Sequence, residues 1–191
     1  MSPGPDGARD GAGGVHAALQ SRAGGAGIGL WSAVVSATAL AVAGLVGLLL
    51  KQPWLFPSLG PTLMVLAETP RQPSAHPRSV LVGHLAGVGA GYLSLVVTGL
   101  ADAPSVIQEG LTGPRVVAAA LSVALTAFVL QALSSPHPPA GATTLIVSLS
   151  LLSKLSELFV IILAVLLCTV VAVGLNLLAG VRQGGVRSAD G

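Results

Sequence analysis

Polar residues that can bind an anion gather at two proline-containing breaks in an otherwise apolar sequence. The first break reads Pro-Ser-Leu-Gly-Pro-Thr over residues 57–62, and the second reads Pro-Pro-Ala-Gly-Ala-Thr over residues 138–143. Both fit Pro-x-x-Gly-x-Thr and lie 81 positions apart. Proline can start a helix, whose first amides have no partner within the helix. Those amides and the helix dipole attract negative charge.

Glycines and hydroxyl side chains make each break suitable for a small anion. Gly60 and Gly141 let a ligand approach the backbone closely, and hydroxyl groups can donate to it. We expect the two helix starts to converge near the membrane midplane and to bind an anion without lysine or arginine. The candidate substrate-binding residues are Ser58, Gly60, Thr62, His84, His137, Pro138, Gly141, Thr143 and Thr144. The alternative is a structural role, since such clusters also mark kinks and close helix contacts.

Two histidines adjoin these breaks. His137 directly precedes the second break, and His84 lies in the first turns of a long apolar segment. An ionisable residue inside the membrane is a functional candidate by default, and imidazole can donate to an anion or carry a proton near neutral pH. A histidine satisfied at a helix contact is the structural alternative, and it is weaker for His137 than for His84.

Metal and catalytic chemistry find little support. His76, Glu68 and Cys168 show no ligand spacing, so we expect no metal and no cofactor. No catalytic triad, carboxylate pair, P-loop or dinucleotide fingerprint is present in the sequence, so we expect no enzyme.

The composition is that of an integral membrane protein. The 191 residues are 52% hydrophobic and 8% charged, with a mean hydropathy of +0.84, whereas soluble domains carry about 25% charged residues. Most of the surface must therefore meet lipid or other helices. The net charge of +2 is small and scattered, so nucleic acid is not an expected partner. The expected partners are the lipid bilayer and a small inorganic anion.

Four long apolar runs predict transmembrane helices over residues 30–50, 80–100, 116–133 and 158–180. Each is close to the ~20 residues that cross the hydrocarbon core, and none contains a charged residue. Two shorter runs, 58–68 and 139–152, follow the proline clusters and are too short to span alone. The sequence thus predicts an all-α integral membrane protein with four long transmembrane helices plus two short broken helices.

The order of these elements predicts two tandem repeats, about 30–100 and 116–180, each with a long, a short and a long helix. If the short segments cross, each half crosses three times and the halves are inverted, as in many secondary transporters. Crossing places six basic residues on the side of the termini and three opposite, whereas re-entry gives five against four. The six are Arg9, Arg22, Arg71, Arg78, Arg182 and Arg187, and the three are Lys51, Arg115 and Lys154. The count favours crossing with both termini cytoplasmic.

The two ends of the chain differ from this membrane domain, which we place at residues 30–181. Residues 1–29 are rich in Gly, Ala, Ser and Pro and predict a disordered cytoplasmic tail, and residues 182–191 predict a second one. The apolar run after residue 29 is too long for a signal peptide, so we expect a multi-pass protein of the cell (inner) membrane. A small-residue stripe at Gly83, Gly87, Gly89 and Gly91 suits close helix packing. At this size we expect a homo-oligomer.

The run His-Pro-Pro-Ala-Gly-Ala at residues 137–142 resembles the signature that names the HPP family of integral membrane proteins. Residues 57–62 and 75–84 resemble the family's other two recurring blocks, so the resemblance covers roughly residues 30–180. The chain has Gly60-Pro61-Thr62 where members typically have Gly-Ala-Ser, and His76-Pro77 where many have Gln-Pro. The resemblance implies four transmembrane helices. It also implies nitrite transport, with which plant chloroplast and cyanobacterial members are associated.

The leading hypothesis is therefore a transporter of a small inorganic anion, nitrite or nitrate. The alternative is a membrane scaffold or sensor that binds an anion or a partner protein without moving it. A membrane enzyme using His84 and His137 as acid and base ranks last, because no nucleophile or metal set accompanies them.

Overall fold

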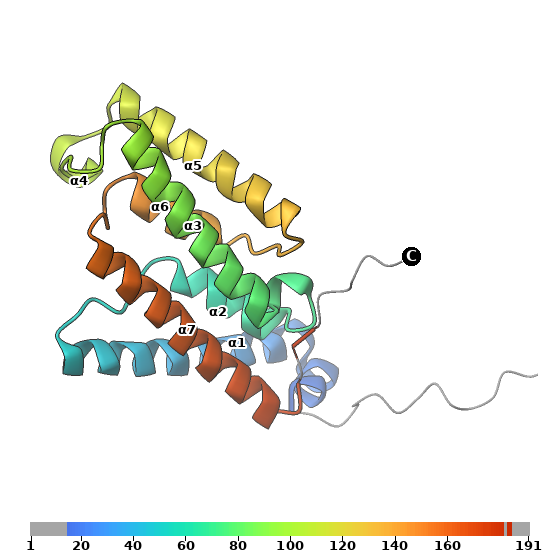
Figure 1. Ribbon diagram of the computed structural model, residues 1–191. Coiled ribbons are helices and arrows are strands. Elements are labelled where there is room, and N and C mark those ends of the chain that lie inside the picture. Colours follow the sequence, from blue (N-terminus) through green and yellow to red (C-terminus); the bar gives the residue numbers. More distant parts are fainter. Residues whose placement is uncertain (1–14, 182, 185–191) are drawn as a thin grey trace, which may run out of the picture.

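The computed structural model describes residues 15–181 and 183–184, and all regular structure in this part of the chain is helical (Figure 1). Four helices are long and apolar enough to cross a membrane. They are Gly24–Leu50 within α1 (Val15–Leu50), α3 (Pro77–Val97), α5 (Gly113–Ala132) and α7 (Leu155–Leu178). The predicted fold class, with four long helices and two short ones, is confirmed.

Three of the long helices begin three residues earlier than predicted. Pro77 opens α3 and Pro114 lies in the first turn of α5, where a missing N–H costs nothing. Helix α1 begins at Val15, and Gly24, with a φ of 52°, separates its first part from the span. Residues 15–29 are thus helical where a disordered tail was expected. Residues 1–14, 182 and 185–191 lie outside the described part, so the tail predictions there stay predictions.

The short helices are α2 (Leu59–Glu68) and α6 (Ala140–Ser148), and each follows a non-helical stretch. Helix α6 ends before the predicted residue 152, because the chain turns at Ser150, whose φ is 56°. Two further single turns, η1 (Pro73–Ala75) and α4 (Val106–Glu109), were not predicted.

Each short helix, together with the stretch before it, crosses the bundle. At the end of α2, Glu68 accepts a hydrogen bond from Ser32, near the start of the α1 span, at 3.0 Å. Just after α6, Ser150 Oγ lies 3.5 Å from Arg115 Nη1 in the first turn of α5. Each short helix therefore ends where the preceding long helix began, as the count of basic residues favoured. The triplets α1–α2–α3 and α5–α6–α7 run in opposite directions (Figure 1), and their origin by duplication stays a prediction.

The last helix of each triplet packs against the first two helices of the other triplet. Helix α7 packs on α1 and α2, whereas α3 packs on α5 and α6. We call these sets the α1/α2/α7 group and the α3/α5/α6 group; they meet along α3 and α7 (Figure 1).

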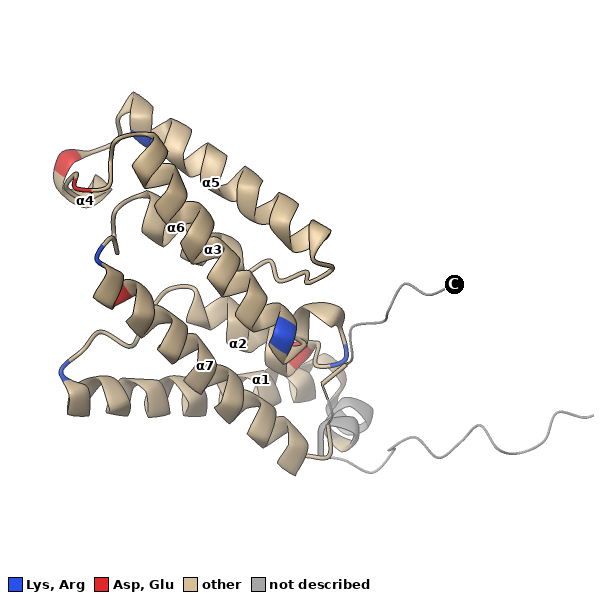
Figure 2. Ribbon diagram, viewed as in Figure 1, with Lys and Arg blue, Asp and Glu red and all other residues tan. Residues whose placement is uncertain are grey.

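Within the described part of the chain, Lys, Arg, Asp and Glu lie at the two ends of the bundle and not in its middle (Figure 2). One end carries Lys51, Glu109, Arg115, Lys154 and Glu157, and the other carries Glu68, Arg71 and Arg78. This separation fits a slab of hydrocarbon between the ends. The predicted choice of the cell membrane, and of the cytoplasm for the termini, stays a prediction.

The buried Arg115 closes one end of the α3/α5/α6 group. Its guanidinium pairs with Glu109 at 2.7 Å and donates to the carbonyl of Pro104. Because these partners lie on the α3–α5 connection and Ser150 follows α6, Arg115 ties two loops to α5.

Candidate functional site

His84 joins the matching threonines of the two sequence motifs. Its Nε2 lies 3.0 Å from Thr62 Oγ1, in the first turn of α2, and its Nδ1 lies 2.7 Å from Thr143 Oγ1, in the first turn of α6. All three side chains are fully buried. The starts of the two broken helices thus converge, as predicted, and an imidazole on α3 lies between them.

His137 completes this cluster from the stretch that precedes α6. Its Nε2 lies 3.4 Å from Thr62 Oγ1, and its Nδ1 donates to the Ser74 carbonyl at 2.8 Å. The two imidazole rings have centroids 5.1 Å apart. Thr62 and Ser74 belong to α2 and η1, whereas His84, His137 and Thr143 lie on or beside α3 and α6. The histidine–threonine cluster therefore lies where the two helix groups meet.

The hydrogen-bond partners fix where the hydrogens lie. Because the Ser74 carbonyl only accepts, His137 Nδ1 carries a hydrogen, and a neutral His137 then presents a bare Nε2 to Thr62. Thr62 Oγ1 also donates to the Ser58 carbonyl, at 2.8 Å. The single hydroxyl hydrogen of Thr62 cannot serve both acceptors. One added proton on His137 Nε2 would satisfy every contact in the cluster.

Thr144 belongs to a neighbouring contact rather than to the cluster. Its Oγ1 donates to the Ala140 carbonyl at 3.0 Å and lies 2.9 Å from Thr126 Oγ1 on α5. It therefore fastens α6 to α5. Thr126 was not among the predicted residues, although a hydroxyl within an apolar span was a signal for it.

The backbone amides differ between the two helix starts. At α6 the N–H groups of Ala140, Gly141 and Ala142 donate to the carbonyls three residues earlier, at 3.0–3.1 Å. Free amides were expected there, and the expectation fails because a tight turn consumes them. At α2, no hydrogen bond from the Gly60 N–H occurs within the described part of the chain. The free donor is thus on the α2 side.

The remaining predicted residues lie around the cluster. Ser58 is buried, its carbonyl binds Thr62, and its Oγ has no partner among the described residues. Gly60 and Gly141 have open space where a Cβ would be, and Pro138 is exposed. The structure therefore brings together Ser58, Thr62, His84, His137 and Thr143, and leaves Gly60, Pro138 and Gly141 at the edge.

Comparisons with known proteins point to a membrane family. A family model described as HPP, transmembrane region, matches residues 23–184. A transmembrane protein of Dictyostelium discoideum is 35% identical over 92 residues, which cover 47% of this chain and 28% of that protein. The match thus spans little more than a quarter of that relative. No solved structure matches the chain.

Proposed function

Because this chain belongs to the HPP transmembrane family, we propose that it transports a small inorganic anion across the membrane. Nitrite is the foremost substrate and nitrate the second. The observation that carries the proposal is the contact of Thr62 with both His84 and His137, where the α1/α2/α7 group meets the α3/α5/α6 group. The choice of nitrite rests on the family resemblance.

The cluster has the donors that a buried anion needs. An unpaired charge in the hydrocarbon core is costly unless hydrogen bonds replace its hydration. The contact between Thr62 and His137, at 3.4 Å, is the longest in the cluster, and the anion would enter by moving these two side chains apart. There an N–H of His84 and an N–H of a protonated His137 would face it, while the Thr62 hydroxyl donates to the Ser58 carbonyl.

A proton would enter with the anion. The bare Nε2 of neutral His137 repels an anion, whereas a protonated His137 donates to it. His84 is the titratable group that faces His137, while α2, α6 and η1 present hydroxyl and carbonyl groups. An anion and a proton bound together add no net charge to the membrane interior, which lowers the cost of crossing.

The position of the cluster suits alternating access. Thr62 lies on the α1/α2/α7 group, and its histidine partners lie on the α3/α5/α6 group. Rocking one group against the other would open the cluster to one side and then to the other, as in transporters built from inverted repeats.

Purified protein in proteoliposomes tests the proposal. We expect nitrite uptake above that of empty vesicles, and faster uptake when the outside is made acidic relative to the lumen. Empty vesicles subjected to the same pH step measure the passive leak of nitrous acid. No uptake above this leak, with either direction of the pH gradient, contradicts the proposal. Nitrite binding without uptake would instead support the scaffold or sensor.

A further inference from the structure

The stretch between α1 and α2 carries a row of polar groups without partners. The N–H groups of Trp54, Leu55, Phe56 and Ser58 donate to no acceptor within the described part of the chain. The buried Trp54 Nε1 and Ser58 Oγ have no partner either. With the Gly60 N–H, this row of donors ends one turn before Thr62.

Such a row needs an explanation at membrane depth. Unpaired backbone amides are rare inside proteins, and in a bilayer they occur only where protein covers them or where they line a wet cavity. Seven non-helical residues, 52–58, can cover at most about 23 Å at ~3.3 Å per residue. That length reaches from the membrane surface to the middle of a core about 30 Å thick.

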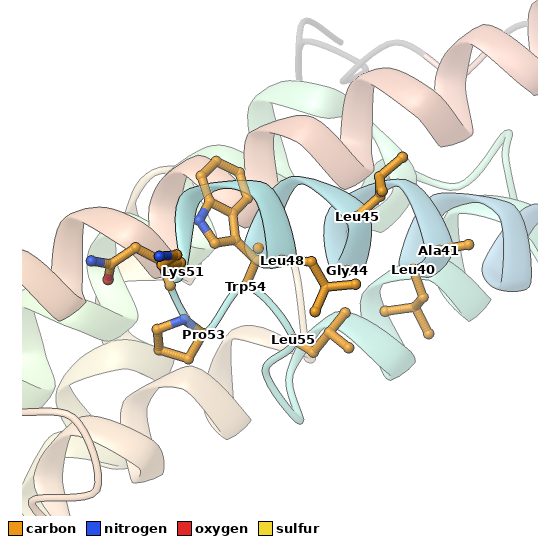
Figure 3. Close-up of a pocket in the computed structure, with 11 residues that line it drawn as sticks. Leu40, Ala41, Gly44, Leu45, Leu48, Lys51, Pro53, Trp54 and Leu55 are labelled. Atoms are coloured by element: carbon orange, nitrogen blue, oxygen red, sulfur yellow. The ribbon is translucent and has the colours of Figure 1, made fainter.

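A groove follows the first part of this row (Figure 3). It has a volume of about 1030 Å³ and lies between the second half of α1 and residues 51–55. Leu40, Gly44 and Leu48 line one side, and Lys51, Pro53 and Leu55 line the other. Lys51 is exposed and no ion pair involves it among the described residues. A cation therefore lies at the end of the groove from which the row of amides starts.

The second break has no comparable row. Prolines occupy positions 136, 138 and 139 and have no N–H to offer. Ser135 N–H donates to Leu130 at 2.9 Å, and Ala140 N–H donates to His137 at 3.0 Å. The two approaches to the cluster therefore differ, and free donors are concentrated on the Lys51 side.

We propose that residues 54–60 form the entry path of the anion, from the Lys51 end of the bundle to Thr62. This inference rests on the proposed transport and adds the side of the membrane from which the anion enters this path. Each amide replaces part of the anion's hydration, and the Ser58 Oγ and N–H are the last donors before the cluster. A second copy of the chain covering the same stretch is the competing occupant, and the experiments below separate the two.

Ser58 offers a conservative way to remove donors. Its φ of −71° and the φ of −58° at the corresponding Pro139 both suit proline. Ser58→Ala removes the hydroxyl, and Ser58→Pro removes the hydroxyl and the N–H. Ser148→Ala is the matched control, because Ser148 is also buried on a short helix with an unpaired hydroxyl.

The expected result is a higher half-saturating nitrite concentration for uptake from the Lys51 side. We expect about tenfold for Ser58→Ala and about a hundredfold for Ser58→Pro, since each lost hydrogen bond to a charge is worth about a factor of ten. Ser148→Ala should match the wild type. If the wild type takes up nitrite and Ser58→Ala has the same half-saturating nitrite concentration as the wild type, the entry path is wrong but the proposed transport stands. No wild-type uptake overturns both.

Cysteine labelling tests the path without measuring transport. In a Cys168→Ala background, Leu55→Cys should react with a charged, membrane-impermeant thiol reagent added on the Lys51 side, and nitrite should slow the reaction. Leu163→Cys is the control. Leu163 lies about 12 Å along α7 from the start of that helix at Leu155, which is a depth similar to that of Leu55. The Leu163 side chain is 48% exposed and the Leu55 side chain 58%. Equal inertness of both cysteines, or an interchain disulfide at Leu55→Cys that excludes the reagent, overturns the path.

Discussion

Close packing of α3 on α6 depends on glycines whose substitution has a calculable cost. A Cβ at Gly87 would lie 2.8 Å from Thr144 Oγ1 and 2.9 Å from the Ala140 carbonyl oxygen. A Cβ at Gly89, half a turn away on the same helix, would meet nothing within 4 Å. The carbonyl belongs to the backbone of α6 and cannot rotate away, so the new methyl group of Gly87→Ala must push α6 outward. The methyl group of Gly89→Ala has open space and leaves α6 in place.

The difference between the two variants isolates the steric term. Both replacements gain up to ~1 kcal/mol of helix propensity, and only Gly87→Ala bears the ~1–3 kcal/mol of overpacking. The free energy of unfolding of the Gly87→Ala variant should therefore be ~1–3 kcal/mol below that of the Gly89→Ala variant.

Unfolding in mixed micelles measures this difference, with helicity followed as the fraction of SDS rises. Gly89→Ala should be as stable as the wild type or slightly more stable. If the two variants unfold with free energies within about 0.5 kcal/mol of each other, α6 does not pack against the face of α3 that carries Gly87.

Three further substitutions probe buried polar contacts. Thr62→Val should reduce nitrite uptake by about a hundredfold or more while the protein still folds, because it removes the hydroxyl that contacts both histidines. Uptake assays on protein of confirmed helicity measure this loss, and unchanged uptake contradicts the site. Arg115→Ala should lower the free energy of unfolding by about 1–3 kcal/mol, because it leaves the Pro104 carbonyl without its donor and the half-exposed Glu109 without its partner. The Arg78→Ala variant, at an exposed position, should stay within about 0.5 kcal/mol of the wild type in the same titration. Asn176→Ala should cost about 1–3 kcal/mol and shift tryptophan emission, since Asn176 accepts from Trp31 Nε1 at 2.9 Å and donates to the Leu66 carbonyl; an unchanged emission spectrum argues against that contact.

Sequence patterns predicted the helices well because each long span depends on a local property. Uncharged runs of about 20 residues predict spans wherever they occur, and the prolines shifted the observed starts by only one turn. The crossing of α2 and α6 was favoured by a small difference in basic residues. The structure shows it through contacts such as Ser32 with Glu68, which join residues far apart in the sequence.

The site was predictable in its residue types but not in its pairing. Thr62, His84, His137 and Thr143 were chosen because polar groups are costly in an apolar segment. The Ser74 carbonyl could not be predicted, because a backbone acceptor has no sequence signal and lies 63 positions from His137. The amides of α6 were mispredicted because the chain makes a tight turn before the helix, and the carbonyls of His137, Pro138 and Pro139 accept from them.

Buried small residues recur at the same 81-residue spacing as the two sequence motifs. The stripe Gly83, Gly87 and Gly91 on α3 corresponds, 81 positions later, to Ala164, Cys168 and Ala172 on α7, all three buried small residues. Each stripe lies on the helix that packs against a short helix, α6 for α3 and α2 for α7. This correspondence supports duplication of the whole three-helix unit rather than of one motif.

The polar residues do not follow this correspondence. The positions that correspond to His84 and His137 are Val165 and Phe56, and the position that corresponds to Ser58 is Pro139. Both imidazoles lie on the α3/α5/α6 group, and the free amides lie in the stretch before α2. Proton and anion would therefore reach Thr62 from chemically different surroundings. In the proposed transporter such a difference would give unequal affinities on the two sides, and the Ser58 variants test the Lys51 side.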